Sequence, residues 1–173
     1  METMTRMTRT ARTTRTHTIV GSPIGPLTLV ASGGVLCGLY LPEHRRGPDP
    51  ASMGVPTSEG FEEVSRQLAE YFDGRRTGFT VPVAPVGTEF QRRVWRALTA
   101  IPYGRTTTYG ALANELGGPG LVRAVGSANA RNPISIIVPC HRVVGSDGSL
   151  TGYAGGLERK RYLLDLESPE RVG

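Results

Sequence analysis

Residues 137–144 read Ile-Val-Pro-Cys-His-Arg-Val-Val, and this stretch places one thiol in a restricted setting. Pro139 fixes its own φ angle and biases Val138 toward an extended conformation, so we expect an extended backbone to lead into Cys140. An imidazole follows the thiol at once, at His141. A cysteine held beside a histidine is a candidate nucleophile, because the imidazole can take its proton. The alternative interpretation is a buried cysteine at the end of a strand, which packs as a small hydrophobic residue.

The length of the chain and its cysteine content limit the class of protein. A chain of 173 residues is long enough for one domain or two small ones. It has no apolar run of membrane-spanning length, so we expect no membrane association. The two cysteines, Cys37 and Cys140, lie far apart in the sequence, and the three histidines are scattered. We therefore expect a cytoplasmic protein with reduced thiols, no metal site and no cofactor.

The net charge of +5 is unevenly distributed. Residues 87–173 hold eleven basic and seven acidic side chains, and a basic half of this kind suits a polyanionic partner. However, nineteen of the 20 basic residues are arginine, which a G+C-rich genome would explain equally well. The charge alone is weak evidence for DNA binding.

The N-terminal half predicts a small antiparallel sheet with one helix. Residues 1–17 alternate threonine with arginine or methionine, and we expect a disordered arm there. Strands separated by glycine- and proline-rich turns are predicted at 18–20, 27–30 and 35–41. After a predicted loop over 43–57, apolar residues at helical spacing indicate a helix over 61–72. These elements would make a first domain over 18–86, with Cys37 packed inside its third strand.

Residues 87–173 predict a second, largely helical domain, which makes the fold class α+β. Thr88 is a suitable N-cap for a helix that ends near Ile101, and Thr108 is suitable for a short helix over 109–116. A third helix is expected over 121–130, after a glycine-rich turn. Two short helices after a longer one resemble a helix-turn-helix, although many helical hairpins share this spacing.

The remainder of the chain leads into and away from the thiol. Asn132 and Pro133 end the third helix, and an apolar run continues to Cys140. A hairpin is predicted around the turn residues 146–148, followed by the glycine-rich segment 152–156 and a closing helix. Glu167 lies near the C-terminus of that helix, where the helix dipole does not favour a carboxylate, so its default position is the surface. The exception would be a carboxylate that holds a histidine.

The segment from Phe90 to Glu167 resembles the O6-alkylguanine-DNA alkyltransferases, also called methylated-DNA–protein-cysteine methyltransferases. The motifs that carry this resemblance are Phe-Gln-Arg-Arg-Val-Trp at 90–95, Ile-Pro-Tyr-Gly at 101–104, Thr-Tyr-Gly-Ala-Leu-Ala at 108–113, Arg-Ala-Val-Gly at 123–126, Asn-Pro at 132–133, Pro-Cys-His-Arg-Val at 139–143 and Gly-Tyr-Ala-Gly-Gly at 152–156. Residues 18–86 resemble the divergent N-terminal domain of the same family. The resemblance implies a C-terminal helix-turn-helix of winged type and a monomer that repairs DNA by direct reversal.

The resemblance also implies roles for individual side chains. Cys140 would accept a methyl or other alkyl group from O6-alkylguanine, and O4-alkylthymine is a second candidate substrate. His141 would act as general base through a water molecule, with Glu167 orienting its imidazole. Asn132 would brace the turn around the site. Tyr109 would donate a hydrogen bond to guanine N3 and so offset the charge on the departing base.

Further residues would contact double-stranded DNA that contains the lesion. Arg123 would take the place of the extruded base in the stack, since a stacked O6-alkylguanine is out of reach of a buried sulfur. The short side chains around it would enter the minor groove. The residues predicted to contact DNA are Arg123, Ala124, Gly126, Ser127 and Thr108.

The substrate pocket is implied to consist largely of main chain. Carbonyl groups of Cys140 and Val143 would accept from the exocyclic amine of guanine, and the backbone of Tyr153 and Ala154 would border O6. Ala154 lacks the hydroxyl that other members carry at this position. Ser135 stands where some relatives have a proline that lines the alkyl pocket, which bears on the acceptance of bulky groups.

Two other functions are compatible with parts of the sequence. A cysteine hydrolase could use Cys140 and His141, but it would leave Arg123 and the bare third helix without a role. A non-catalytic helix-turn-helix protein could bind alkylated DNA, but it would not need the cysteine. The thioether product of alkyl transfer is a poor leaving group, so the predicted enzyme would act once per molecule.

Overall fold

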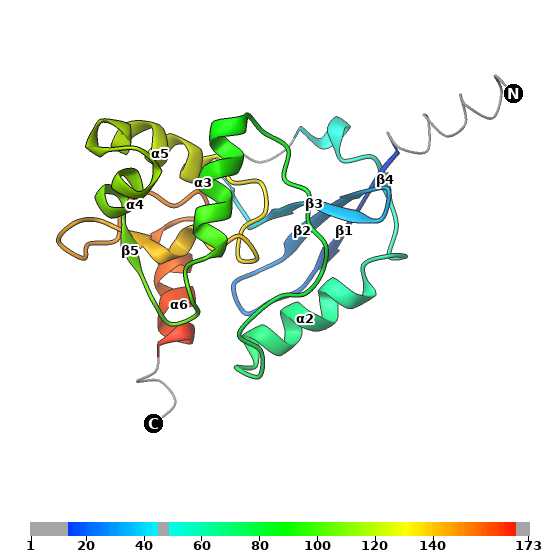
Figure 1. Cartoon of the computed structure of the whole chain (residues 1–173). Coiled ribbons are helices and arrows are strands. Elements are labelled where there is room, and N and C mark those ends of the chain that lie inside the picture. The colour runs from blue at the N-terminus through cyan, green and yellow to red at the C-terminus, as the bar shows by residue number, and fades with distance from the viewer. Residues whose placement is uncertain (1–13, 45–48, 169–173) are drawn as a thin grey trace, which may run out of the picture.

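The computed structural model describes residues 14–44 and 49–168 (Figure 1). The N-terminal half contains a four-stranded sheet in the order β3-β2-β1-β4. Its strands are β1 (Arg15–Val20), β2 (Leu27–Ser32), β3 (Val35–Tyr40) and β4 (Val55–Pro56). The three long strands are antiparallel, as predicted, and helix α2 (Glu62–Phe72) runs beside them.

Two boundaries in this half differ from the prediction. Strand β1 begins at Arg15, so the disordered arm predicted over 1–17 extends too far, while residues 1–13 lie outside the described residues. Threonine is β-branched and suits a strand when a neighbouring strand supplies hydrogen-bond partners. Strand β2 supplies them here, and the composition of residues 1–17 does not indicate this pairing. The predicted loop over 43–57 contains a 3-10 turn (Pro50–Ser52) and the short strand β4, which pairs in parallel with β1.

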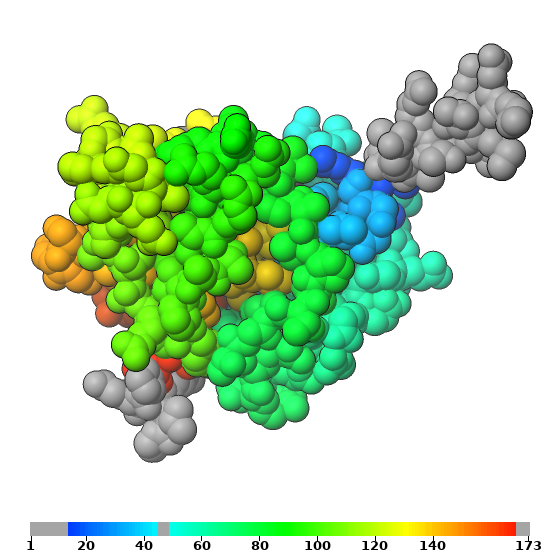
Figure 2. Space-filling model, viewed as in Figure 1, coloured from blue at the N-terminus to red at the C-terminus, as the bar shows by residue number. Residues whose placement is uncertain are grey.

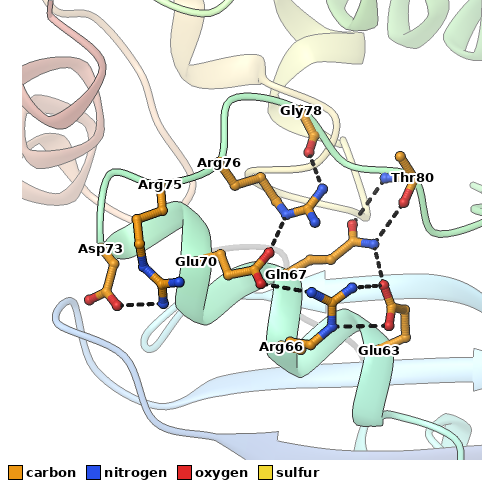
Figure 3. A network of polar contacts seen from close by, with 9 residues as sticks. All are labelled: Glu63, Arg66, Gln67, Glu70, Asp73, Arg75, Arg76, Gly78 and Thr80. Atoms are coloured by element: carbon orange, nitrogen blue, oxygen red, sulfur yellow. Dashed lines mark hydrogen bonds and ion pairs between the residues drawn. The ribbon is translucent and has the colours of Figure 1, made fainter.

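A polar network along α2 fixes the segment that follows the helix (Figure 3). The amide of Gln67 donates to Thr80 Oγ1 at 2.7 Å and accepts from the Thr80 backbone N–H at 3.0 Å. Glu70 accepts from Arg66 at 2.7 Å and from Arg76 at 2.8 Å. These ion pairs are exposed or half-buried and contribute little to stability by themselves, but Gln67 is buried and its two bonds tie Thr80 to the helix.

The C-terminal half is helical, as predicted. Its elements are α3 (Glu89–Thr99), β5 (Thr107–Thr108), α4 (Tyr109–Leu116), a 3-10 turn (Pro119–Leu121), α5 (Val122–Ala130), the 3-10 turn η3 (Cys140–Arg142), β6 (Val143–Val144) and α6 (Leu157–Glu167). Both predicted N-caps are confirmed: Thr88 forms a capping box with Gln91, and Thr108 Oγ1 accepts from Ala111 N at 3.0 Å. Helices α4 and α5 pack against each other in the helix-turn-helix region.

The predicted hairpin after the cysteine is only partly present. A turn does form at residues 146–148, and Gly145 N donates to Ser149 O at 2.8 Å. No strand follows this turn among the described residues. Strand β6, which precedes the turn, pairs in parallel with β5 instead. The backbone donors and acceptors of β6 are therefore used by the segment that leads into α4.

The two halves share one continuous apolar core, and the sheet extends across their boundary. Strand β3 pairs in parallel with Val83, in the linker that joins α2 to α3 (residues 73–88), and with Ile134. Leu39 N donates to Pro133 O at 2.8 Å, and Ser135 N donates to Leu39 O at 3.0 Å. The N-terminal sheet thus holds the segment that leads to the thiol.

Within residues 14–44 and 49–168, no helix combines the length and the apolar character that crossing a membrane requires.

Candidate active site

The segment before Cys140 forms a tight turn rather than the predicted extended approach. Val138 N donates to Ile134 O at 3.0 Å, and Ile136 adopts φ 72°, which is rare for a β-branched residue. The amide of Asn132 explains the turn: it donates to Val138 O at 2.8 Å and accepts from Ile134 N at 3.0 Å. These bonds outweigh the β propensity of the run, and they place Asn132 where it was predicted to brace the site.

The thiol of Cys140 is sheltered inside this turn. Cys140 is 4% exposed and is the first residue of η3. Burial raises the pKa of the Cys140 thiol, while the side chain of Asn132, the charge of Lys160 and the hydroxyl of Ser135 oppose the rise only in part. The thiol is therefore neutral at rest, and a base has to remove its proton before it can attack.

His141 is fully buried and has the arrangement of a base. Its Nε2 lies 2.8 Å from Glu167 Oε2. Burial lowers the pKa of His141 despite the carboxylate, so the imidazole is neutral at rest. A neutral imidazole beside a carboxylate carries its proton on Nε2, which leaves Nδ1 unprotonated. Within the described residues, Nδ1 is buried and has no partner, so its lone pair can accept a proton.

Glu167 is 2% exposed, so the default expectation of a surface position is wrong. Arg142 contacts both carboxylate oxygens, with Nε 2.8 Å from Oε1 and Nη2 3.0 Å from Oε2. The same guanidinium donates to Ile101 O at 2.6 Å. Burial raises the pKa of Glu167, but the hydrogen bonds from His141 and Arg142 outweigh it and lower the pKa to about 2. Glu167 is therefore a carboxylate at any pH at which the protein works.

Sequence reasoning missed two polar residues of the site, Lys160 and Tyr71. Lys160 is fully buried, and its Nζ donates to Val143 O at 2.7 Å and Thr151 O at 2.8 Å. Burial lowers the pKa of Lys160 to about 8. Lys160, Leu163 and Glu167 recur at helical spacing on the buried side of α6, a signal that the sequence did carry. No local signal marks Tyr71, which reaches Glu167 from the N-terminal half.

The predicted pocket residues line the neighbourhood of the thiol to different degrees. Ser135, Val143 and Tyr153 are buried, and Ala154 is half-buried. The hydroxyl of Tyr109 donates to Thr151 O at 3.4 Å, and burial raises the pKa of its phenol, so Tyr109 is a neutral donor. The Val143 carbonyl already accepts from Lys160, which leaves one lone pair for a ligand.

The predicted DNA-contacting residues lie on the outside of α5 and at its neighbour's N-terminus. Arg123, Ala124 and Ser127 are exposed, and Arg123 forms no hydrogen bond or ion pair with residues 14–44 or 49–168. A Cβ atom built at Gly126 meets nothing within 4 Å, which confirms that this face is open. Thr108 is half-buried and its hydroxyl serves as the N-cap of α4.

A hollow also lies between the two halves, next to the active-site turn. It has a volume of about 320 Å³, and its walls include Phe79, Val83, Tyr103, Pro139 and Arg142. Figure 2 shows the active-site segment, in gold, between the linker and α3. Arg142 of the buried ion pair therefore forms part of the wall of this hollow.

Comparison with known proteins matches both halves of this architecture. Residues 16–85 match the family model described as 6-O-methylguanine DNA methyltransferase, ribonuclease-like domain. Residues 89–169 match the model described as 6-O-methylguanine DNA methyltransferase, DNA binding domain. The chain belongs to the 6-O-methylguanine DNA methyltransferase family.

Individual members of the 6-O-methylguanine DNA methyltransferase family are similar over most of their length. The methylated-DNA–protein-cysteine methyltransferase of Mycobacterium tuberculosis is 51% identical over 148 residues, which cover 86% of this chain and 89% of the relative. The protein of that name from Methanosarcina acetivorans is 50% identical over 151 residues, covering 87% and 97%. The crystal structure of M. tuberculosis OGT in complex with DNA has a TM-score of 0.82 at 48% identity, covering 91% of this chain and 97% of that one.

Proposed function

We propose that the protein repairs O6-alkylguanine in double-stranded DNA by transferring the alkyl group to its own Cys140. The observation that carries this proposal is the buried thiol next to a histidine whose free Nδ1 faces no protein partner among the described residues. A buried neutral thiol needs a base, and the Glu167–His141 pair is built to supply one.

The transfer is an in-line displacement at the alkyl carbon. The proton of Cys140 moves to His141 Nδ1 through a water molecule, and Glu167 stabilises the imidazolium that results. The sulfur then forms a bond to carbon as the bond from carbon to guanine O6 breaks, and the electron pair leaves with guanine. Tyr109 donates to guanine N3 and offsets this charge. The thioether that remains on Cys140 ends the reaction after one turnover.

Recognition of DNA uses the exposed face of α5. Cys140 is 4% exposed, so the damaged base has to leave the stack to reach its sulfur. Arg123 fills the vacated space, and the small residues Ala124, Gly126 and Ser127 let the helix approach the minor groove, with Thr108 at the start of α4. Inside the pocket, main-chain groups of Cys140, Val143, Tyr153 and Ala154 select guanine, and Ser135 borders the alkyl group.

The acceptor has to remain reduced, which fits a cytoplasmic protein. Both described cysteines, Cys37 and Cys140, are free thiols. We further propose that one monomer binds one lesion without a cofactor, because all groups used by the displacement lie in one chain.

Intact-mass measurement tests this function directly. The protein is incubated with duplex DNA that contains O6-methylguanine, and peptide mapping locates the added mass. We expect one methyl group on Cys140 and none elsewhere, with the amount of repaired DNA limited to one equivalent of protein. Cys140→Ala should abolish transfer and retain affinity for DNA, because the thiol makes no contribution to the surface of α5.

The other outcomes assign other functions. Repeated turnover with an unmodified protein would support a cysteine hydrolase. Binding of the lesion without any change in mass would support a non-catalytic DNA-binding protein. Either result would overturn alkyl acceptance by Cys140.

A further inference from the structure

One side chain of the N-terminal half, Tyr71, reaches the buried polar groups around Cys140, which we call the acceptor centre. Tyr71 on α2 donates from its hydroxyl to Glu167 Oε2 at 2.6 Å, across 96 residues of sequence. Tyr71 is fully buried, and so is the bond. The oxygen that accepts from Tyr71 is the oxygen that contacts His141 Nε2 at 2.8 Å. Tyr71 and His141 thus share one acceptor atom.

We propose that Tyr71 is a positioning residue for alkyl transfer: it fixes the Glu167 carboxylate from the N-terminal half and sets how strongly Oε2 holds the imidazole of His141. The proposal rests on the proposed function of Cys140 and His141. Tyr71 acts through Glu167 and not on the substrate. The N-terminal half, to which no site residue was assigned from the sequence, would then tune the base.

The surroundings of Tyr71 restrict its ring. The ring of Phe79 lies 5.5 Å from it and the ring of Tyr103 lies 6.3 Å from it, centroid to centroid. Phe79 belongs to the segment that Gln67 ties to α2 through Thr80, as Figure 3 shows. Gln67 and Tyr71 lie four residues apart on the same buried side of α2, so the bonds of Gln67 to Thr80 help to hold the packing around the Tyr71 ring, where the hydroxyl meets the carboxylate.

The bond from Tyr71 has a definite direction. Burial and the neighbouring Glu167 raise the pKa of Tyr71 well above its usual range, so the phenol stays neutral and can only donate to the carboxylate. A donor withdraws negative charge from Oε2. The charged form of His141 is then less stabilised than it would be by a carboxylate without this donor. Deleting the hydroxyl should therefore make His141 a stronger base.

Other charged and titratable groups face the same pair, and they are retained when only the hydroxyl is removed. Arg142 binds both oxygens of Glu167 from η3. The charges of Arg142 and Lys160 oppose protonation of His141, and Glu167 interacts with Tyr153. Cys140 adjoins the imidazole in sequence, and its thiolate form raises the pKa of Lys160. Tyr71→Phe changes none of these side chains.

The test compares the full-length parent protein with Tyr71→Phe. Single-turnover methyl transfer from duplex DNA containing O6-methylguanine is measured across pH, and His141 is titrated by NMR with ¹⁵N-labelled histidine. We expect the midpoint of the acid limb and the midpoint of the His141 titration to move together to higher pH. The rate at alkaline pH should be retained, because His141 is neutral there in both proteins.

Arg159→Met is the matched control for contact between the halves. Arg159 on α6 donates to Ile24 O at 2.9 Å and to Pro42 O at 3.2 Å, so it crosses the same boundary without a bond to Glu167. This variant should lower thermal stability and leave the His141 titration unchanged. In a Glu167→Gln background, Tyr71→Phe should produce no shift, since the carboxylate through which it acts is absent.

The outcomes separate this inference from the proposed function. If Tyr71→Phe slows transfer at every pH and His141 titrates as in the parent, Tyr71 has only a structural role. A shift of equal size in Arg159→Met would assign the effect to loosening of the boundary and would also overturn the inference. If the parent does not methylate Cys140, the proposed function fails, while the NMR titration still decides whether Tyr71 tunes His141.

Discussion

The polar groups around Cys140 are buried and nearly all bonded, whereas the face of α5 that carries Arg123 is exposed and bare. The single carboxylate of Glu167 accepts hydrogen bonds from Tyr71, His141 and Arg142. Arg123, by contrast, has no partner within the described part of the chain. The proposed chemical centre is thus bonded in the free protein, while the proposed recognition surface would gain its contacts from DNA.

This difference has an energetic basis. A buried ion pair is costly to form and costlier to break, so the acceptor centre has one arrangement that the fold enforces. An exposed arginine on a helix of small residues has no buried partner to lose. Its side chain stays solvated in the free protein and can adapt to the duplex. Substitutions in the first region should therefore affect chemistry and stability together, and substitutions in the second should affect only the handling of DNA.

Glu167→Gln should have the largest effect on both properties. Loss of the carboxylate removes the partner that stabilises the imidazolium and should slow transfer about 100-fold. It also leaves Arg142 buried without its counter-ion, which should lower the free energy of unfolding by about 3 kcal/mol. Single-turnover kinetics and urea unfolding at neutral pH measure the two losses; a stable variant with the parent's rate would show that the buried pair has no role.

The pH dependence of stability gives a second readout of Glu167. Its pKa is about 2 in the folded protein and 4.5 without the fold, so its contribution is complete above pH 4.5 and is lost as the pH falls toward 2. Between pH 5 and pH 3 the parent should lose about 2 kcal/mol more unfolding free energy than Glu167→Gln does. Equal losses in the two proteins would mean that the carboxylate is not held in its charged form.

Lys160→Met should have the next largest effect on transfer. It removes the cation that opposes the raised pKa of the Cys140 thiol, and the rate at neutral pH should fall about tenfold, as for a change of roughly one pKa unit. The pKa of Lys160 is about 8, so its charge is lost as the pH rises through 8, and the difference from the parent should shrink there. Arg161→Met, an exposed neighbour on α6, is the control and should react like the parent.

Arg123→Ala should affect recognition and leave the chemistry intact. Without a side chain to fill the vacated stack, transfer from duplex DNA should slow about fivefold, within the few kcal/mol that unstacking costs. Transfer from free O6-methylguanine base should be unchanged, because no base has to leave a stack. The ratio of the two rates is the measurement, and Arg75→Ala, which removes one exposed positive charge from the N-terminal half, is the control. Equal slowing with both substrates would place Arg123 in the chemical step.

The contrast between these regions also explains what the sequence could predict. Thr88 and Thr108 were predicted as N-caps because capping depends on residues three positions apart. The motif around Cys140 and the small residues of α5 are local as well. Their positions, and the family to which the chain belongs, follow from short stretches of sequence.

What the sequence did not predict depends on contacts between distant segments. The bond from Tyr71 to Glu167 spans 96 residues, and nothing near Tyr71 distinguishes it from an ordinary core aromatic. The resemblance implied the contact of Glu167 with His141, but not the bonds from Arg142, which lies on a different element. The extended approach to Cys140 was wrong because the side chain of Asn132 replaces the strand's backbone partners, and propensity does not include such bonds.

The smallest predicted effect on transfer distinguishes Thr88 from Thr108, which are both N-caps but of different helices. Thr88→Ala and Thr108→Ala each remove an N-cap and should each lower the free energy of unfolding by about 1 kcal/mol. Tyr109 is the first residue of α4, so fraying after Thr108→Ala displaces its hydroxyl and should slow transfer about twofold, which corresponds to roughly 0.4 kcal/mol. Thr88 caps α3, whose N-terminus carries none of the proposed site residues, and Thr88→Ala should transfer at the parent's rate. Thermal unfolding and single-turnover kinetics on both variants measure the pair. If the two variants transfer at equal rates, the N-cap of α4 does not position Tyr109. Transfer would then depend less on the helix end than the geometry indicates.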